Sequence, residues 1–182
     1  MKNDTATNSK RSEPLIVSVS GLRGIVGESL TDTVAAAYAC SFTETLRAGP
    51  VVIGRDGRES GPALKEAIAK ALIASGRDVL DCDTASTPTV GVAIVENNAA
   101  GGIQISASHN PAQYNGLKLF SSEGRVLPAV AGEAVRLRLK LFEGLRPKYK
   151  RSLPMDVSVP LKAHCHISTR FLKLLTLNQF VR

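Results

Sequence analysis

The chain has 182 residues, a formal net charge of +7 at pH 7, 43% hydrophobic residues and 21% charged residues. This composition is ordinary for a globular protein that buries a core, and no apolar run reaches the roughly 20 residues of a membrane span. The first residues hold no stretch of signal-peptide type, and the three cysteines show no CxxC spacing, so we expect a cytoplasmic protein without structural disulfides.

Short apolar runs alternate with helical patterns along most of the chain. Residues 1–14 are polar and charged, which predicts a disordered leader. The glycine-punctuated segment 21–27 predicts a loop. We predict strands at 15–19, 51–53, 78–82, 103–106 and 117–120, and helices at 31–47, 62–75, 87–96 and 128–143. Thr31 and Ser60 are the expected N-caps, and Gly76 is expected to end the second helix.

This order of elements is typical of an α/β fold. We expect a three-layer α/β/α sandwich with a mixed, mostly parallel sheet over residues 15–145. Residues 146–182 are interpreted as a linker and the start of a truncated second domain. The linker interpretation rests on the prolines of 144–162. The truncation is inferred from an apolar helical stripe at 164–180, after which only two residues remain to pack against it.

The basic residues concentrate in 136–151 and in the tail from Lys162 onward. They could form a nucleic-acid surface, or a solvated helix face together with a cationic pocket for an anionic substrate. No aromatic-interleaved basic stripe or nucleic-acid motif occurs, so we expect neither a nucleic-acid nor a membrane partner. The nucleic-acid alternative predicts retention that falls steeply with salt.

The segment 103–118 is the most informative part of the sequence. A β-branched run leads into a polar loop at 107–115, and a second apolar run follows. Pro111 keeps Asn110 out of the helical conformation, so the loop cannot wind into a helix. Asn115 and the glycine after it are expected to form the turn into the second strand.

This loop carries groups that suit phosphoryl transfer. Ser108 offers a hydroxyl nucleophile, His109 follows it directly, and Lys118 lies in the next predicted strand. Phosphoryl transfer depends on alignment and on neutralising the phosphate oxygens, and cations beside a fixed serine supply both. A covalent serine intermediate would also divide one transfer into two steps.

Four motifs carry a resemblance to a known family. ISASHNPAQYNGLKLF resembles the phosphoserine loop of the α-D-phosphohexomutases, whose usual form is T-A-S-H-N-P. Ser106 stands where threonine is commoner and keeps the hydroxyl. SGLRGIVG (20–27), IGRDGRESG (53–61) and TASTPTVGVAI (84–94) resemble three further elements of the family, in its order. The chain is therefore identified as a member of this family of phosphoglucomutases, phosphomannomutases and phosphoglucosamine mutases, of which it holds domain I.

The resemblance implies an intramolecular phosphotransferase of carbohydrate metabolism. Such an enzyme moves phosphate between the 1- and 6-positions of a hexose phosphate through a bisphosphorylated sugar. Ser108 would be the phosphorylated residue, and His109 would lie in the pocket. Lys118 would bind substrate and transfer a proton, while Arg23 would bind substrate and stabilise charge near the transferring group.

Plainer interpretations of these residues stay open. His109 could brace the loop through a backbone hydrogen bond, and Lys118 could be a solvated strand residue. Arg55, Asp56 and Arg58 are interpreted as ion-pairing residues that support the serine loop rather than as catalytic groups. The alternative function is a non-catalytic sugar-phosphate or anion-binding module of the same fold.

The resemblance also implies a magnesium ion. It would be held through the phosphate on Ser108 and by an aspartate-rich loop of a second domain. The sequence contains no D-x-D-x-D motif, so the remaining ligands are expected in a missing domain. We therefore expect the 182-residue chain alone to be inactive and name a complementing C-terminal fragment as a partner. The sugar-selecting loop is absent, so glucose, mannose and glucosamine phosphates all remain open.

Overall fold

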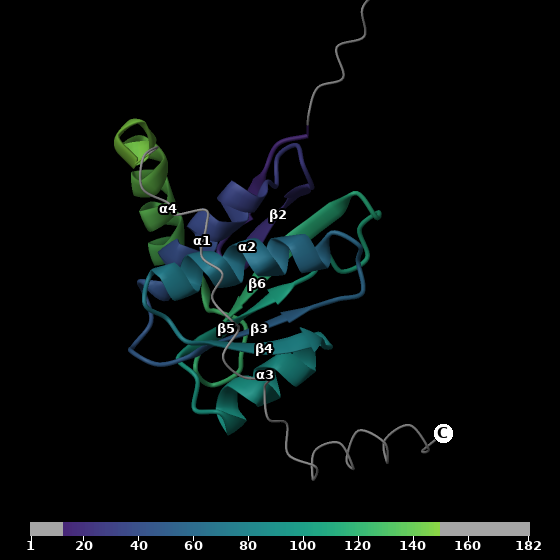
Figure 1. The fold of residues 1–182 in the computed structure, drawn as a ribbon, viewed down its shortest axis with the longest axis vertical. Coiled ribbons are helices and arrows are strands. Elements are labelled where there is room, and N and C mark those ends of the chain that lie inside the picture. The colour runs from purple at the N-terminus through teal and green to yellow at the C-terminus, as the bar shows by residue number, and fades with distance from the viewer. Residues whose placement is uncertain (1–12, 150–182) are drawn as a thin grey trace, which may run out of the picture.

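The structure is a computed structural model that describes residues 13–149 (Figure 1). The leader predicted for 1–14 therefore lies outside the described residues except at its last two positions. The linker and truncated second domain predicted for 146–182 lie outside them beyond Tyr149. None of the described helices has the length and hydropathy that crossing a membrane would need.

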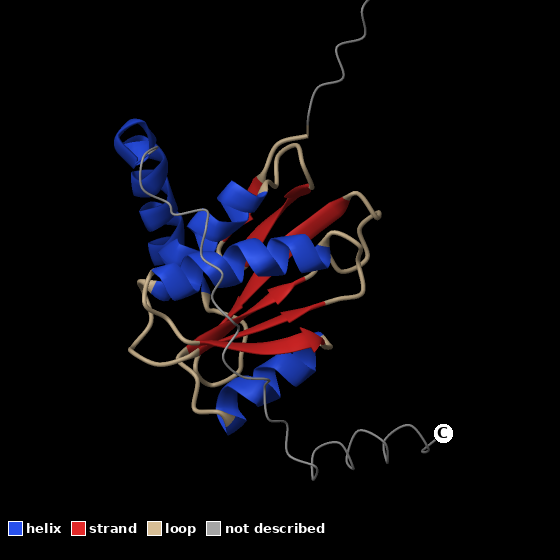
Figure 2. Ribbon diagram, viewed as in Figure 1, coloured by secondary structure: helices blue, strands red, loops and turns tan. Residues whose placement is uncertain are grey.

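The described residues form an α/β fold of six strands and four helices (Figure 2). In chain order these are β1 (Ile16–Ser18), β2 (Gly21–Ile25), α1 (Asp32–Thr43), β3 (Val51–Arg55), α2 (Gly61–Ala74), β4 (Val79–Thr84), α3 (Thr87–Glu96), β5 (Gly101–Ile105), β6 (Tyr114–Phe120) and α4 (Ala129–Tyr149).

The strands form one sheet in the order β1-β2-β6-β5-β3-β4. Strand β3 pairs in parallel with β4 and β5, whereas the β1–β2, β2–β6 and β5–β6 pairs are antiparallel. The mixed sheet is confirmed. The expectation that it is mostly parallel is wrong for residues 13–149, because the hairpin made by β1 and β2 extends the sheet beyond β6.

Strand β2 corrects the loop predicted at 21–27. Leu22 pairs with Leu117 of β6, and both side chains are buried. The glycines are needed because the two backbones lie close together: a Cβ on Gly21 would lie 2.1 Å from the carbonyl oxygen of Leu117. Glycine in a strand marks such an approach as readily as it marks a loop.

Asn115 and Gly116 do not form the predicted turn, because they lie inside β6. Asn115 pairs with Gly24 and is fully buried, and its Nδ2 donates a hydrogen bond to Ser60 Oγ at 2.9 Å. Neither residue has the positive φ that makes Asn-Gly a turn sequence. The serine loop is therefore shorter at its C-terminal side than the sequence indicates.

The helix ends show which predicted caps form. Thr31 Oγ1 accepts a hydrogen bond from the backbone N–H of Val34 at 3.3 Å, as expected of an N-cap. Gly76 has a φ of +82°, and the N–H of Arg77 reaches the Leu72 carbonyl at 2.9 Å, so α2 ends there as predicted. Ser60 makes no side-chain cap, because its hydroxyl accepts the Asn115 hydrogen bond instead.

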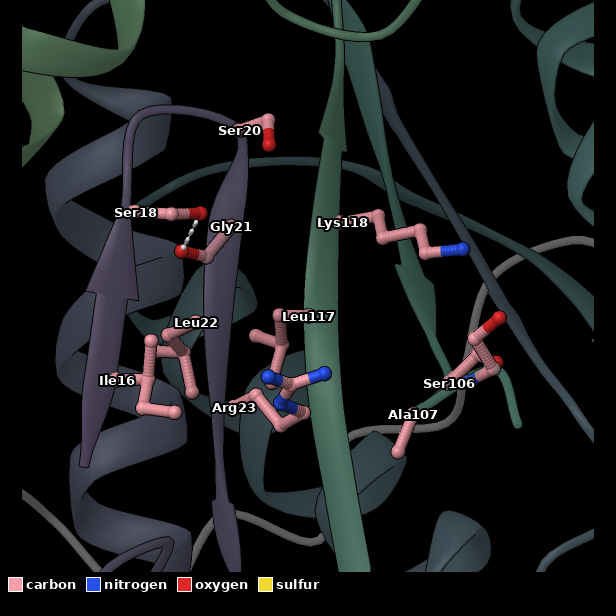
Figure 3. A pocket seen from close by; sticks show the side chains of 11 residues that line it. Ile16, Ser18, Ser20, Gly21, Leu22, Arg23, Ser106, Ala107, Leu117 and Lys118 are labelled. Atoms are coloured by element: carbon pink, nitrogen blue, oxygen red, sulfur yellow. Dashed lines mark hydrogen bonds between the residues drawn. The ribbon is translucent and has the colours of Figure 1, made fainter. Parts of the chain in front are cut away.

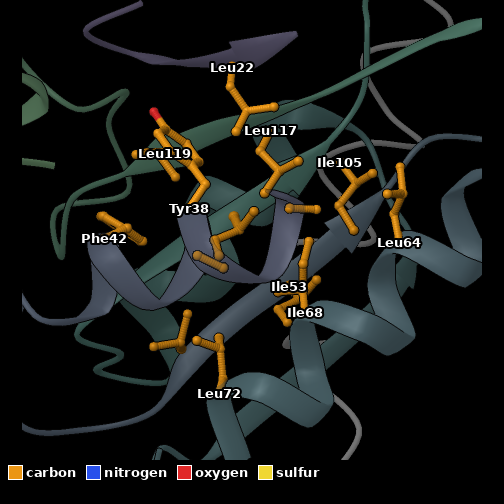
Figure 4. Close-up of a cluster of buried hydrophobic side chains, with 14 of the residues drawn as sticks. Leu22, Tyr38, Phe42, Ile53, Leu64, Ile68, Leu72, Ile105, Leu117 and Leu119 are labelled. Atoms are coloured by element: carbon orange, nitrogen blue, oxygen red, sulfur yellow. The ribbon is translucent and has the colours of Figure 1, made fainter. Parts of the chain in front are cut away.

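Helices cover both faces of the sheet. Helices α1, α2 and α4 pack with the larger apolar core, which holds Tyr38 and Phe42 of α1 against leucines and isoleucines of the strands (Figure 4). Helix α3 packs on the opposite face, against β3 and β5. Helix α4 continues to Tyr149, past the predicted end at residue 143, although the extension includes Gly144 and Pro147, which are poor helix formers.

Alternation along the strands directs two cations to the α3 face. Leu22 and Leu117 face the larger core, so their strand neighbours face the other way. Arg23 of β2 and Lys118 of β6 are such neighbours. Helix α3 lies over β3 and β5, which leaves the half of this face formed by β2 and β6 for the site.

Candidate functional site

A pocket of about 240 Å³ lies where the β1–β2 hairpin, β6 and the loop after β5 meet. Its lining includes the cations Arg23 and Lys118 and the hydroxyl groups of Ser18, Ser20 and Ser106 (Figure 3). The hydroxyl-bearing Ser108 also lines it. Predicted site residues from two distant parts of the sequence thus line one pocket.

The β2–β6 register explains why the pocket is open. Lys118 lies opposite Gly21, and Arg23 lies opposite Gly116. Residues directly opposite each other share a face of the sheet, so on this pair of strands each cation lies opposite a glycine, whereas on the other side Lys118 lies opposite Gln104 of β5 and Arg23 opposite Ile16 of β1. The two glycines contribute no side chain to the space beside the cations.

Neither of the two cations, Arg23 and Lys118, forms an ion pair within residues 13–149. Arg23 Nε is buried and has no hydrogen-bond partner within residues 13–149. A buried donor without a partner costs stability, and a bound anion would remove that cost.

Ser108 stands at the exposed rim of this pocket. Its φ of +56° is in the left-handed region, which costs a non-glycine residue about 1–2 kcal/mol. Its N–H donates to Ser106 Oγ at 3.1 Å, which helps to hold this conformation. Ser106, which stands where the family more often has threonine, thus uses its hydroxyl to support the backbone of Ser108.

His109 is placed less centrally. Its side chain is exposed and is not part of the pocket lining, and its Nδ1 lies 3.5 Å from Ser108 Oγ, at the limit of a hydrogen bond. The structure thus brings Ser108, Lys118 and Arg23 to one pocket and leaves His109 at its outer edge.

Arg58 lies beneath the serine loop and forms an ion pair with Asp56 at 3.2 Å. Its two terminal nitrogens donate to backbone carbonyls of the loop. The sequence interpretation of Asp56 and Arg58 as supporting residues fits these contacts. The number of loop carbonyls that Arg58 reaches could not be foreseen, because they are about fifty residues away in the chain.

Arg55 belongs to a different cluster at the ends of β3 and β4. It pairs with Asp83 at 2.9 Å, and Lys65 of α2 pairs with Asp81 at 2.7 Å and with Asp83 at 3.1 Å. Burial alone would lower the pKa of Lys65, but hydrogen bonds to the two carboxylates raise it above its ordinary value. Both aspartates are thus engaged by cations.

Residues 13–149 do not by themselves fit a magnesium site. No group of three or more His, Cys, Asp or Glu side chains in this range is placed to hold a metal ion. Magnesium requires several oxygen ligands in octahedral geometry, and the pocket supplies cations and hydroxyls rather than carboxylates.

Comparison with known sequences places these features in a family. A family model described as phosphoglucomutase/phosphomannomutase, alpha/beta/alpha domain I, matches residues 15–140. A probable phosphoglucosamine mutase of Pyrococcus abyssi is 45% identical over 105 residues, covering 58% of this chain and 23% of the relative. A phosphoglucosamine mutase of Frankia alni is 37% identical over 144 residues, covering 72% of this chain and 32% of the relative. The chain thus spans about a quarter to a third of the length of these relatives.

Solved structures give the same result. A putative phosphomannomutase from Thermus thermophilus superposes with a TM-score of 0.62 at 29% identity, covering 70% of this chain and 30% of that one. A phosphoglucomutase/phosphomannomutase family protein from Burkholderia thailandensis has the same TM-score, identity and coverage.

Proposed function

Because the chain belongs to the phosphoglucomutase/phosphomannomutase family, as its α/β/α domain I, we propose that Ser108 accepts and returns the phosphoryl group of a hexose phosphate. The observation that carries this proposal is the pocket lined by Ser108 and two cations without ion-pair partners among the described residues. An anionic group bound there would meet a hydroxyl nucleophile and both positive charges.

The transfer proceeds in two balanced steps. In the first, the free hydroxyl of the hexose phosphate attacks phosphorylated Ser108, so that the bond between phosphorus and the sugar oxygen forms while the bond between phosphorus and Ser108 Oγ breaks. The proton of the sugar hydroxyl passes through Lys118 to Ser108 Oγ, and a hexose bisphosphate results. In the second step Ser108 Oγ attacks the other phosphate, the bond between that phosphorus and its sugar oxygen breaks, and the serine proton passes through Lys118 to the leaving sugar oxygen. Arg23 neutralises the equatorial phosphate oxygens throughout.

The substrate and the metal belong to the same proposal. The relatives are named as mutases of glucosamine and mannose phosphates, and we assign this chain a hexose phosphate of that class. Magnesium would bind through the phosphate on Ser108, with its other ligands outside residues 13–149. For that reason we propose that the 182-residue chain alone has no appreciable mutase turnover and needs a complementing fragment.

Phosphoryl uptake tests the proposal. The full chain is incubated with a radiolabelled hexose bisphosphate and magnesium, and the labelled peptide is mapped by mass spectrometry. We expect label on Ser108 that Ser108→Ala abolishes. The matched control is Ser121→Ala, since Ser121 follows β6, does not line the pocket and hydrogen-bonds Glu123. Absence of label, or label that persists in Ser108→Ala, would contradict the proposal, and hexose phosphate binding that this variant retains would favour a non-catalytic binding module.

A further inference from the structure

The guanidinium of Arg58 uses both terminal nitrogens on the serine loop. Nη2 donates to the carbonyl oxygens of Ser108 at 3.0 Å and Asn110 at 2.7 Å. Nη1 donates to the carbonyl oxygens of Pro111 at 2.8 Å and Tyr114 at 3.0 Å. Four carbonyls spread along the loop therefore converge on one side chain.

The remaining donor of the Arg58 guanidinium, Nε, is bound by Asp56. Arg58 Nε donates to Asp56 Oδ2 at 3.2 Å, and Asp56 Oδ1 accepts the Arg58 backbone N–H at 3.1 Å. A guanidinium has five N–H donors in a planar fork, and all five of Arg58 have a partner. Its side chain is only 16% exposed, so Asp56 balances its charge and no donor is left for a substrate phosphate.

Other contacts of the described residues hold the loop mainly at its ends, where Val26 N–H donates to the Gln113 carbonyl and Ser106 N–H to the Gly116 carbonyl. Within the loop, Asn110 donates to the Ala107 carbonyl and Tyr114 N–H to the Pro111 carbonyl. Ser108, which holds an unfavourable left-handed conformation, has its N–H bound by Ser106 Oγ, but none of these contacts reaches its carbonyl. Arg58 binds the carbonyl of this residue directly.

We propose that Arg58 is the positioning residue of Ser108: it fixes the loop backbone so that the hydroxyl stays at the rim of the pocket. Arg58 does not line the pocket, so its effect on chemistry is through Ser108. The effect on transfer rests on the proposed function, whereas the effect on loop order does not. Lysine cannot replace Arg58, since an ammonium has three donors and no planar fork.

Arg77 provides a matched control. Its terminal nitrogens also donate to four backbone carbonyls, at the opposite end of β3 from the serine loop: those of Thr43, Leu46, Arg47 and Gly49. Arg58→Met and Arg77→Met thus remove the same kind of contact at two places. Both variants should fold and melt at lower temperatures than the unchanged chain.

Hydrogen exchange of the full chain measures loop order. In Arg58→Met and Arg58→Lys we expect amides of 106–113 to exchange at least about tenfold faster, since local opening costs less free energy. Peptides of β3 and β5 should keep their exchange rates. Arg77→Met should leave the 106–113 peptide unchanged. Equal exchange of that peptide in Arg58→Met and the unchanged chain would overturn the inference.

The kinetics of phosphoryl uptake distinguish positioning from general stability. In Arg58→Met the maximal rate of Ser108 labelling by a hexose bisphosphate should fall about a hundredfold, with little change in the half-saturating concentration. Added ethylguanidinium should restore part of the rate in Arg58→Ala but not in Arg77→Ala. Labelling of Arg58→Met at the unchanged rate would overturn the inference. If the unchanged chain takes no label, the proposed function fails, and the exchange measurement still decides whether Arg58 holds the loop.

Discussion

At the scale of single residues, Arg23 lowers the stability of the unliganded fold, because its buried Nε lacks a partner within residues 13–149, although the strand around it is well packed. This cost indicates that the side chain serves binding rather than stability. Such an unpartnered donor destabilises the unliganded fold and stabilises a complex with an anion. The sequence indicated Arg23 through its motif, but only the structure shows that its Nε has no hydrogen-bond partner within residues 13–149.

Replacing Arg23 should therefore separate binding from stability. We expect Arg23→Met to bind inorganic phosphate at least about tenfold more weakly, since a charge-assisted contact is lost. Its free energy of unfolding should stay equal or rise by about 1 kcal/mol. Titration followed by phosphorus NMR and urea unfolding measure the two quantities. A clear loss of stability in Arg23→Met would show that the guanidinium has an internal partner.

The Cys40 thiol makes the free energy of unfolding depend on pH in the alkaline range. Burial, and to a lesser degree the carboxylate of Glu44, raise the pKa of this thiol from 9.0 to about 11. Above pH 9 the unfolded chain therefore loses the thiol proton while the folded chain keeps it. Stability from this group is complete below pH 9 and is lost as the pH rises to 11.

We expect the loss to be about 2 kcal/mol between pH 9 and pH 11, at 1.36 kcal/mol for each pKa unit with allowance for partial exposure. Urea unfolding at a series of pH values measures it. Cys40→Ala is the control, since it removes the titrating group. An equal fall of the free energy of unfolding in both proteins would show that other groups cause it.

At the scale of elements, the sequence predicted all four helices and five of the six strands of residues 13–149, and missed β2. Helical periodicity and caps are local signals, so α1 to α3 could be placed from Thr31, Gly76 and Thr87-Pro88 together with the apolar spacing between them. Strand β2 has only five residues, of which two are glycines, so no local alternation shows. The same limit made Asn115 and Gly116 look like a turn, because their burial depends on β2 lying beside them.

The glycines of β2 and β6 should tolerate no side chain. A Cβ on Gly21 would lie 2.1 Å from the Leu117 carbonyl oxygen, so Gly21→Ala must push the two strands apart. We expect a loss of about 1–3 kcal/mol in the free energy of unfolding. The matched control is Gly57→Ala, since nothing lies within 4 Å of its added methyl group. Equal stabilities of the two variants would contradict the β2–β6 pairing described here.

At the scale of the whole molecule, the two faces of the sheet have different roles: one carries the apolar core and the other the candidate site. The face under α1 and α2 carries the large apolar core, and the half of the other face that α3 leaves open carries the pocket. The motifs identified Ser108, Lys118 and Arg23 in advance, because each motif is local. They could not indicate that His109 lies outside the pocket lining or that Arg58 binds four carbonyls of the loop. Those facts depend on how distant segments pack.

The proposed function depends on the Ser108 hydroxyl accepting a phosphoryl group at this pocket. Site-resolved mass spectrometry of the full chain after incubation with a hexose bisphosphate measures this step. We expect one added phosphoryl group on Ser108, lost in Ser108→Ala and reduced in Arg23→Met and Lys118→Met. A chain that gains no phosphoryl group, or gains it equally in Ser108→Ala, would show that Ser108 is not the acceptor.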